Sequence, residues 1–351
     1  MSDEMVLVTG SLGWLGFNLT KALLYGLEDE RVFTIPFKNY KVRCLVMPDQ
    51  DDELLRELSD SIEIVKGDLR NPDDCSRFCN GADGSIIFHT AGIIHPARVS
   101  DFFKINVEGT KNLLDAAINT GVKRAVVVSS NSPCGCNPHP DHLFDEESPY
   151  RPYMNYGRSK MMMEILVNEI HRTGRIGTVI IRSPWFYGPN QPPRQTLFFR
   201  MIRDGKAPIV GGGNNLRSMT YIDNLCQGLL LSAYKKEADG ETYWIADERP
   251  YSMNEIIETV ERLLETEFGQ KCSHKRTRLP NLASETAFYT DAFIQRIGFY
   301  NQKIHVLSEM NKTIACSINK TRLELGYNPE VGLEEGMRRS IRWLFEQRGG
   351  L

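Results

Sequence analysis

Met5-Val6-Leu7-Val8-Thr9-Gly10-Ser11-Leu12-Gly13-Trp14-Leu15-Gly16 is the stretch from which the architecture of this chain can be worked out. The apolar run over residues 5–8 does not alternate with polar residues, which is typical of a parallel strand buried on both faces. A turn with three glycines follows this run, and a helical pattern begins directly after the turn. Gly10 would permit a tight turn, Gly13 the close approach of a pyrophosphate, and Gly16 close packing of the helix on the strand. A phosphate bound there would lie at the positive end of the helix dipole.

The composition is that of an ordinary globular protein, and the formal net charge of −3 gives no argument for nucleic acid or a membrane as a partner. A length of 351 residues suggests two domains. We expect a cytoplasmic protein, because no apolar run is long enough to span a bilayer and the acidic N-terminus lacks a signal-peptide pattern. The eight cysteines lack zinc-ligand spacing, so we expect reduced thiols and no metal site.

Strand and helix patterns alternate through the first half of the chain. Continuous apolar runs predict further strands at residues 42–47, 62–66, 85–88, 125–129 and 177–182, and helical patterns cover residues 14–27 and 102–119. This alternation predicts an α/β fold with a doubly wound parallel sheet. A polar and aromatic insert, Glu28 to Tyr40, has no role that the sequence indicates.

The end of the second predicted strand bears on the choice of dinucleotide. In dinucleotide-binding folds an acid at this point bonds the adenosine ribose of NAD, and an arginine favours NADP. The sequence here is Met47-Pro48-Asp49, which matches neither pattern cleanly. Asp49 slightly favours NAD, and NADP stays open.

Three residues suited to proton and hydride chemistry follow the predicted strands. Tyr156 and Lys160 are four residues apart, so on a helix they lie on one face about one turn apart. The Lys160 ammonium would then lower the pKa of the Tyr156 phenol, whose ordinary value is about 10. A phenolate can take a proton from a substrate hydroxyl while hydride leaves the same carbon. Ser130 follows a buried strand, where its hydroxyl can bond the reacting oxygen.

Taken in order, Gly10-x-x-Gly13-x-x-Gly16, Asp68-Leu69, His89-Thr90-Ala91-Gly92, Ser129-Ser130 and Tyr156-x-x-x-Lys160 form a pattern of motifs. The chain resembles the extended short-chain dehydrogenase/reductases, in the NAD-dependent epimerase/dehydratase group that includes nucleotide-sugar epimerases and 3β-hydroxysteroid dehydrogenases. The resemblance implies a Rossmann-type NAD(P)-binding domain over residues 1–184 with 221–248. It also implies a smaller mixed α/β substrate domain over residues 185–220 with 249–351, and a homodimer.

The resemblance assigns roles to individual residues. Ser130, Tyr156 and Lys160 would be catalytic, and His89 would be a structural histidine. Arg182 could be structural. The implied cofactor contacts are Gly10, Leu12, Gly13, Trp14, Leu15, Gly16, Asp49, Asp68, Leu69, Thr90, Ala91, Gly92, Asn106, Tyr156, Lys160, Pro184 and Trp185.

The substrate is narrowed by further positions. His95 and Arg98 are candidate substrate contacts, because they follow the fourth predicted strand, and Asn131 directly follows Ser130. Arg217 occupies the position of an arginine that holds the diphosphate in sugar-nucleotide enzymes of this group, and a guanidinium can bind phosphate bidentately.

The reaction class stays partly open. The residues after Ser130 lack the acid of 4,6-dehydratases, so dehydration is disfavoured, whereas the C-terminal half lacks the Arg-Pro-Gly-Asp-like segment of many sugar epimerases. We therefore expect an NAD(P)-dependent epimerase of a nucleotide-linked sugar. The alternatives are a net oxidoreductase, such as a 3β-hydroxysteroid-dehydrogenase-like enzyme or a keto-sugar reductase, and a non-catalytic NAD(P) sensor.

Overall fold

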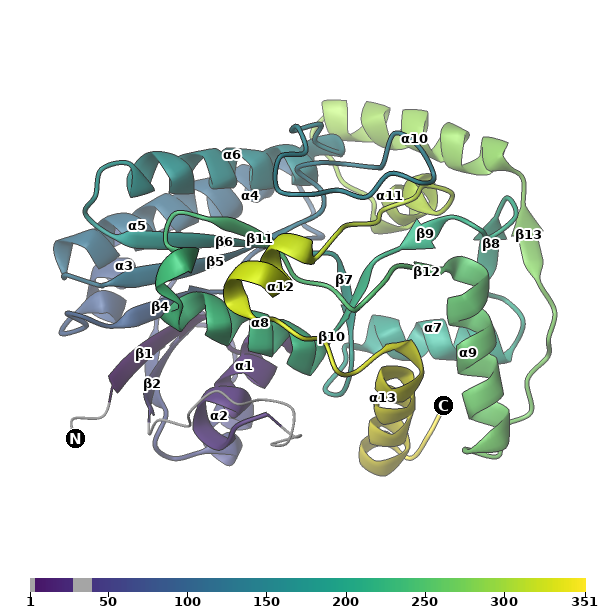
Figure 1. The fold of residues 1–351 in the computed structure, drawn as a ribbon, viewed down its shortest axis with the longest axis horizontal. Helices are drawn as coiled ribbons and strands as arrows, with labels where there is room; N and C mark the ends of the chain where they lie inside the picture. Colours follow the sequence, from purple (N-terminus) through teal and green to yellow (C-terminus); the bar gives the residue numbers. More distant parts are fainter. Residues whose placement is uncertain (1–3, 28–39) are drawn as a thin grey trace.

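Seven parallel strands form the central sheet of the computed structural model, which describes residues 4–27 and 40–351. The sheet has the order β11-β6-β5-β4-β1-β2-β3 (Figure 1). Its strands are β1 Glu4–Thr9, β2 Tyr40–Val46, β3 Glu63–Lys66, β4 Ile86–His89, β5 Arg124–Ser130, β6 Gly177–Ser183 and β11 Thr242–Trp244. The order reverses between β1 and β4, and ligands of such sheets bind outside the carboxyl ends of the strands at that reversal. The predicted doubly wound sheet is confirmed.

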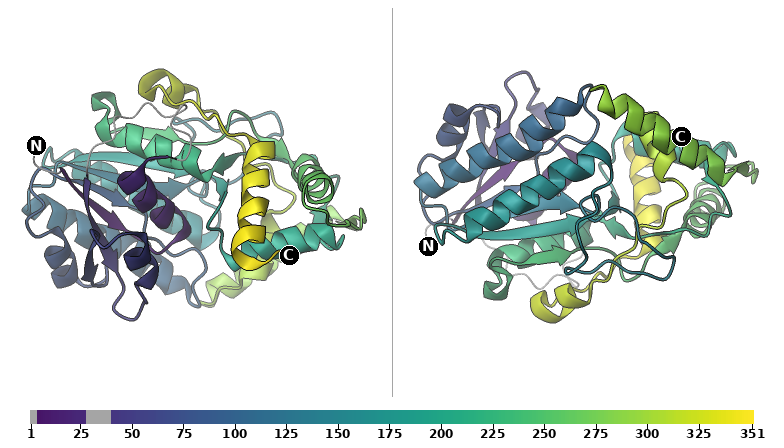
Figure 2. Two further views of the ribbon diagram at one scale, coloured as in Figure 1. Left: turned by 90° about the horizontal axis from the view of Figure 1, so that it is seen from below. Right: turned by 90° about the horizontal axis from the view of Figure 1, so that it is seen from above.

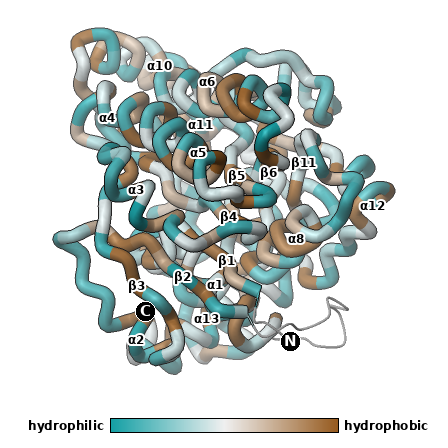
Figure 3. The backbone as a smooth tube through the Cα atoms, turned by 90° about the vertical axis from the view of Figure 1, so that its left-hand side faces the viewer, coloured by the Kyte–Doolittle hydropathy of each residue, from teal (hydrophilic) through white to brown (hydrophobic). Residues whose placement is uncertain are grey.

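Helices cover both faces of the sheet, which explains why its strands are continuous apolar runs. Helices α1 Trp14–Tyr25 and α8 Ile222–Tyr234 pack together on one face. Helices α3 Pro72–Cys79, α5 Thr110–Asn119 and α6 Met154–His171 cover the other. Figure 2 shows α1 in the view from below and α5 with α6 in the view from above. Hydrophobic residues accordingly lie along the central strands, between the two helical layers (Figure 3).

The predicted helix over residues 102–119 is present as an uninterrupted helical run, but its hydrogen-bonding pattern changes along its length. The structure divides this region into α4 Val99–Phe103, a π-helical segment η1 Lys104–Gly109, and α5. Within η1 the Asn106 side chain bonds the backbone of Ile93, and a methyl on Gly109 would lie 3.1 Å from Cβ of Leu69. The π-helical turn therefore coincides with contacts to residues that are distant in the sequence. Helical periodicity does not predict such contacts.

Most of the remaining elements form the part of the molecule on the right in Figure 1, whereas α12 lies near the middle, beside β11. The remaining strands pair as β7 with β10, β9 with β12, and β8 with β13. The strands are β7 Trp185–Tyr187, β8 Pro208–Val210, β9 Leu216–Arg217, β10 Met219–Tyr221, β12 Tyr251–Ser252 and β13 Thr277–Leu279. The helices are α7 Pro193–Arg203, α9 Met253–Thr266, α10 Asn281–Arg296, α11 Gln302–Glu309, α12 Asn319–Leu325 and α13 Leu333–Arg348. Helix α2 Glu53–Leu58 and the short 3₁₀ turn η2 Lys236–Ala238 complete the described elements.

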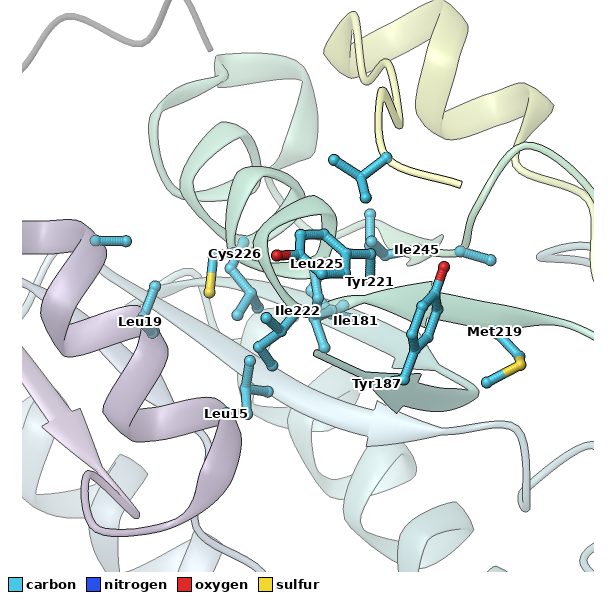
Figure 4. Close-up of a cluster of buried hydrophobic side chains, with 14 of the residues drawn as sticks. Leu15, Leu19, Ile181, Tyr187, Met219, Tyr221, Ile222, Leu225, Cys226 and Ile245 are labelled. Carbon is cyan, nitrogen blue, oxygen red and sulfur yellow. The ribbon is translucent and has the colours of Figure 1, made fainter. Parts of the chain in front are cut away.

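One buried cluster joins the two parts of the molecule. Figure 4 shows Leu15 and Leu19 of α1 beside Ile222 of α8, with Tyr187 and Tyr221 on the far side. All five side chains are at most 6% exposed. The position of the glycine turn is thereby tied to the segment that follows β6.

The sequence also raised the questions of a membrane span, a metal site and the insert over residues 28–40. In residues 4–27 and 40–351 no helix combines the length and apolarity needed to cross a bilayer. The same residues contain no group of three or more His, Cys, Asp or Glu side chains placed to hold a metal ion. The insert of unknown role, apart from Tyr40, lies outside the described residues.

Candidate active site

The glycine turn connects the end of β1 to the start of α1. Gly10 has φ +73°, and a methyl on it would lie 2.7 Å from the Ala91 nitrogen. A methyl on Gly16 would lie 2.1 Å from the Gly10 carbonyl oxygen, so the helix packs directly on the turn. A methyl on exposed Gly13 would meet only that oxygen, at 3.1 Å. Gly10 and Gly16 are thus required by the fold itself, whereas Gly13 leaves an open space in front of the first turn of α1, whose N–H groups lack intrahelical acceptors.

The three residues predicted beside these glycines differ in their surroundings. Leu12 is partly exposed next to Gly13. The Trp14 indole nitrogen donates to the Pro189 carbonyl oxygen at 2.7 Å, and its ring lies 5.0 Å from that of Phe186. The Leu15 side chain is part of the core, so only its backbone is available for a ligand.

The ends of β1 and β4 are joined by side chains. Thr90 donates to the Thr9 carbonyl oxygen at 2.7 Å, and the Ala91 N–H donates to the Thr9 hydroxyl at 3.3 Å. The two ring nitrogens of His89 bond Thr9 and Thr110 at 2.7 and 2.8 Å. Burial lowers the pKa of His89 to about 3, so this histidine is neutral. The contacts agree with a structural role for His89.

The candidate adenosine end lies beyond β2 and β3. Asp49 is exposed in the turn after β2. The Asp68 carboxylate accepts two hydrogen bonds from the Arg70 guanidinium, which holds the pKa of Asp68 below its ordinary value. Leu69 is buried, with 6% exposure. Arg70 therefore already binds the Asp68 carboxylate. The Asp49 carboxylate has no hydrogen bond or ion pair among the residues that the structure describes.

Ser130, Tyr156 and Lys160 come together where β5 ends and α6 begins. The Ser130 hydroxyl hydrogen-bonds the Tyr156 phenol and also accepts the Ser132 N–H at 3.1 Å. The Lys160 ammonium is buried and donates to the Val128 carbonyl oxygen at 2.9 Å. The spacing of Tyr156 and Lys160 on one helix places the ammonium one turn below the phenol.

The electrostatics of this group differ from the expectation. Burial raises the pKa of the Tyr156 phenol, and the groups that oppose this are the Ser130 hydroxyl and the Arg194 guanidinium. Burial also lowers the pKa of Lys160 to about 8. The expected lowering of the Tyr156 pKa by Lys160 is absent, because the ammonium is directed at the backbone of β5.

A buried ion pair holds the middle of α6 against β6. The Glu164 carboxylate accepts from Arg182 at 2.7 Å and from Ser129 at 2.6 Å, and Tyr150 donates to its second oxygen at 2.9 Å. Glu164 is fully buried, and Arg182 is 3% exposed. The contacts give Arg182 the structural role that the sequence left open. The pair ties α6 to β6 directly behind Ser130.

Asn106 is occupied by structural contacts. Its amide oxygen accepts the Ile93 N–H at 2.8 Å, and its amide nitrogen donates to the Ile93 carbonyl and to Ser159 at 3.1 Å. A methyl on Gly92 would lie 3.3 Å from this amide oxygen and 3.4 Å from the Lys160 nitrogen. The Asn106 side chain therefore holds the 92–93 segment beside Lys160, and its contact with the cofactor stays a prediction.

Pro184 and Trp185 begin the segment that leaves the sheet. Ser183 is in register with Ser130, so Pro184 is buried just beyond the candidate catalytic serine. Trp185 packs against Phe198 of α7 with 5.6 Å between ring centroids. The two residues lie at the carboxyl edge of β6, and their contact with the cofactor stays a prediction.

The predicted substrate residues differ in their surroundings. His95 bonds the Tyr300 hydroxyl at 2.8 Å, and burial with nearby Arg194 lowers the pKa of His95 to about 4. Arg98 is exposed, and Asn131 accepts backbone N–H groups in a turn. The Arg217 guanidinium donates to the carbonyl oxygen of Glu309, at the end of α11. One donor of Arg217 is thus already used by the protein.

The sequence reasoning missed a polar chain, that is, a row of hydrogen-bonded polar side chains that connects α10 to α6. The amide oxygen of Gln295 accepts the Asn155 N–H at 3.1 Å, and its amide nitrogen donates to Asp291 at 2.8 Å. Asp291 also binds His305 at 2.7 Å, and this carboxylate raises the pKa of His305. The polar chain anchors Asn155, the residue before Tyr156. Asn155 and Gln295 are 140 positions apart, so no local sequence pattern indicated this contact.

Comparisons with known proteins agree with this geometry. An uncharacterized protein, y4nL of Sinorhizobium fredii, is 52% identical over 98% of this chain and 96% of its own length. The 3beta-hydroxysteroid-dehydrogenase/decarboxylase isoform 1 of Arabidopsis thaliana is 26% identical over 97% of this chain and 79% of its own length. Among solved structures, the dTDP-glucose 4,6-dehydratase DesIV from Streptomyces venezuelae, with NAD bound, has a TM-score of 0.76 and 26% identity over 98% of both chains. A family model described as the NAD dependent epimerase/dehydratase family matches residues 6–246. The chain belongs to the NAD-dependent epimerase/dehydratase family.

Proposed function

We propose that the protein is an NAD-dependent epimerase of a nucleotide-linked sugar, with Tyr156 as its acid–base group. The observation that carries the proposal is the contact between the Ser130 hydroxyl and the Tyr156 phenol, at the carboxyl end of β5 beside β4 and one helical turn from Lys160. In this proposal residues 1–184 with 221–248 bind the cofactor, and residues 185–220 with 249–351 contribute the substrate contacts.

The residues present fit NAD. Gly13 borders open space, because a methyl on it would have only the Gly10 carbonyl oxygen within 4 Å, and the free N–H groups at the start of α1 suit a pyrophosphate. Asp49 is the exposed acid at the end of β2, where NAD-binding folds bond the ribose. When bound, NAD accepts a hydride from a carbinol carbon of the substrate.

The side chains of the chain itself supply the proton chemistry. The Tyr156 phenol takes the proton of the substrate hydroxyl, and Ser130 bonds the same oxygen and fixes its position. Lys160 is buried one helical turn away, where it donates to the Val128 carbonyl oxygen and fixes the start of α6 against the end of β5. Epimerisation leaves no net redox change, because the hydride given up by the carbinol carbon is returned to the opposite face of that carbon while Tyr156 reprotonates the same oxygen.

Two features narrow the reaction and the substrate. Asn131 and Ser132 follow Ser130, so the position at which 4,6-dehydratases of this family carry an acid has no carboxylate, and dehydration is disfavoured. Arg217 keeps donors beyond the one used for the Glu309 carbonyl, and these can bind a diphosphate.

A second candidate function is net oxidation or reduction of an alcohol. The observation in its favour is the match to the Arabidopsis hydroxysteroid dehydrogenase/decarboxylase along 97% of this chain. The same Ser130 and Tyr156 contact would serve this reaction, and Arg217 would then lack a diphosphate to bind.

One experiment separates the two functions. The purified protein is denatured to identify released small molecules, and the native protein is mixed with uridine- and guanosine-diphosphate sugars while absorbance is followed at about 340 nm, where reduced nicotinamide absorbs. Retained NAD and sugar conversion without a lasting absorbance change support the epimerase. Stoichiometric NADH release with a sterol or another alcohol contradicts it and supports the oxidoreductase.

A further inference from the structure

Helix α10 buries polar side chains and exposes apolar ones, although a surface helix ordinarily turns its apolar stripe to the core. Three of its four buried side chains are polar, namely Ser284, Asp291 and Gln295. Leu282, Tyr289 and Phe293 have the same spacing two positions earlier, which places them on the opposite face of the helix. These three side chains are 71%, 71% and 64% exposed. The helix lies at the outer edge of the molecule, at the top in Figure 1.

Hydrogen bonds hold the polar face of α10 against the rest of the protein. Ser284 donates to a backbone carbonyl of α11 at 2.6 Å, and Asp291 binds His305 of the same helix at 2.7 Å. Gln295 accepts the Asn155 N–H at the start of α6. Because α10 is fixed to two neighbouring helices by its polar side chains, its apolar side chains must face outward.

The exposed apolar surface continues beyond the end of the helix, where Ile297 and Phe299 are 56% and 59% exposed. We call Leu282, Tyr289, Phe293, Ile297 and Phe299 the α10 surface. At about 200 Å² for each aromatic side chain, its three aromatic residues alone expose about 400 Å². This area is already typical of the largest apolar patch on a monomeric protein, and such patches mark interaction sites.

The unpaired charges around the α10 surface are positive. Arg296 on α10 and Lys303 on α11 are exposed, and neither forms an ion pair in the part of the chain that the structure describes. Arg98, whose backbone bridges to Phe299, is also exposed and forms no ion pair with a described residue. The carboxylates of the two helices, by contrast, all have basic partners: Glu285 with Lys312, and Asp291 and Glu309 with His305.

These charges distinguish a lipid surface from a second copy of the chain. A symmetric contact between two copies sets the same patch of each chain face to face. The cations Arg98, Arg296 and Lys303 of both copies would then meet without a free carboxylate to pair with, which is unfavourable. An anionic bilayer suits both features, because apolar side chains of a surface helix insert among the acyl chains while neighbouring cations attract the headgroups.

We propose that the α10 surface docks the protein on an anionic lipid bilayer, with α10 lying in the plane of the membrane. The formal net charge of −3 gives no sign of such a partner, because it averages over the whole surface. An open groove of about 440 Å³ lies between α10 and α11, and its lining includes Leu282, Ile304 and Leu307. This groove can accept the end of an acyl chain.

Docking would bring the candidate active site close to the membrane. Tyr300 directly follows the α10 surface, and its ring lies 5.4 Å from that of Phe102. The Phe102 ring lies in turn 5.8 Å from the Tyr156 ring. A single aromatic side chain therefore separates Tyr300 from the proposed acid–base group. The inference does not depend on which alcohol reacts there.

Co-sedimentation of the full chain with vesicles tests the proposal. The vesicles consist of phosphatidylcholine alone or of equal parts of phosphatidylcholine and phosphatidylglycerol. Phe293→Asp and Arg296→Gln change the α10 surface and its charge. Leu323→Asp on α12 and Arg175→Gln before β6 are the matched controls, because both residues are exposed and lie outside this surface. Retention of NAD and an unchanged thermal unfolding curve show that each variant is folded.

The wild type and both controls are expected to bind the anionic vesicles, more weakly at high salt, and to bind the neutral vesicles less. Phe293→Asp should weaken binding at least about 10-fold, because the bilayer then no longer buries the ring. Arg296→Gln should weaken it about 5-fold, which is the contribution of one cation at an anionic membrane surface.

A fluorescent probe separates insertion into the bilayer from adsorption by charge. Phe293→Trp should be quenched by lipids with brominated acyl chains, and Leu323→Trp should not. Absence of binding to anionic vesicles, binding that Phe293→Asp leaves unchanged, or a Phe293→Trp emission that the brominated lipids leave unquenched would overturn the inference. Sedimentation equilibrium without lipid gives the last check: a dimer that Phe293→Asp dissociates would show that a second copy covers the α10 surface, and would also overturn it.

Discussion

Substitution of Gly13 and Gly16 by alanine separates the needs of the fold from the needs of the cofactor. In Gly16→Ala the new methyl would lie 2.1 Å from the Gly10 carbonyl oxygen and 2.8 Å from the Thr90 hydroxyl. Backbone cannot yield cheaply there, so we expect a loss of about 1–3 kcal/mol or more in the free energy of unfolding. In Gly13→Ala the only neighbour within 4 Å is the Gly10 oxygen, at 3.1 Å. The φ of −75° at Gly13 suits alanine, so the loss is at most about 1 kcal/mol, from the weaker helix cap.

The affinity for NAD should follow a different order. A methyl on Gly13 would occupy the space proposed for the pyrophosphate. Overpacking costs about 1–3 kcal/mol, which would raise the dissociation constant for NAD by about 5- to 150-fold. Urea denaturation without NAD measures the first quantity, and titration calorimetry of folded Gly13→Ala measures the second. The reasoning is refuted if Gly13→Ala binds NAD as the wild type does, or if it destabilises the protein as much as Gly16→Ala.

Further predictions concern the ion pair, the thiols and the polar chain. Glu164→Ala leaves Arg182 buried without its partner and should cost about 3–5 kcal/mol in urea denaturation, whereas Glu169→Ala, on the exposed face of the same helix, should cost little. Burial raises the pKa of all eight cysteine thiols above their ordinary value of 9.0, so the folded state keeps protons that the unfolded state releases. Under reducing conditions the contribution of the thiols to the free energy of unfolding should therefore be intact below about pH 9 and fall between pH 9 and 11. Lys160, whose pKa is lowered to about 8, has the opposite effect on the free energy of unfolding, but it is a single group. Constant stability up to pH 11 would contradict this. Gln295→Ala should lower kcat and leave NAD binding unchanged, because it frees the backbone at the start of α6; an unchanged kcat would show that the polar chain does not position the phenol.

Local chemistry made the cofactor end of the molecule predictable. The glycine spacing and the continuous apolar runs specify a strand, a turn and a helix within 20 residues, and the order of such units implies the sheet. The spacing of Tyr156 and Lys160 likewise follows from one helix. These features depend on residues that are close in sequence, so their geometry can be inferred without a structure.

The substrate end depended on contacts between distant residues. Asn106 looked like a family motif, but its amide is used to hold Ile93 and to shape a π-helical turn. Arg217 was expected to be free for a diphosphate, and the carbonyl that it contacts is 92 residues away. Such pairings leave no periodic trace in a single sequence.

The central claim, that Tyr156 performs the proton transfer of an NAD-dependent reaction, is tested most directly by Tyr156→Phe. The variant keeps the ring that packs 5.8 Å from Phe102 and removes only the hydroxyl. Single-turnover hydride transfer to bound NAD, followed at about 340 nm, should fall by about 10²–10⁴-fold while the dissociation constant for NAD stays as in the wild type. Hydride transfer at the wild-type rate, or a biological effect of the protein that persists unchanged in Tyr156→Phe, would contradict the account.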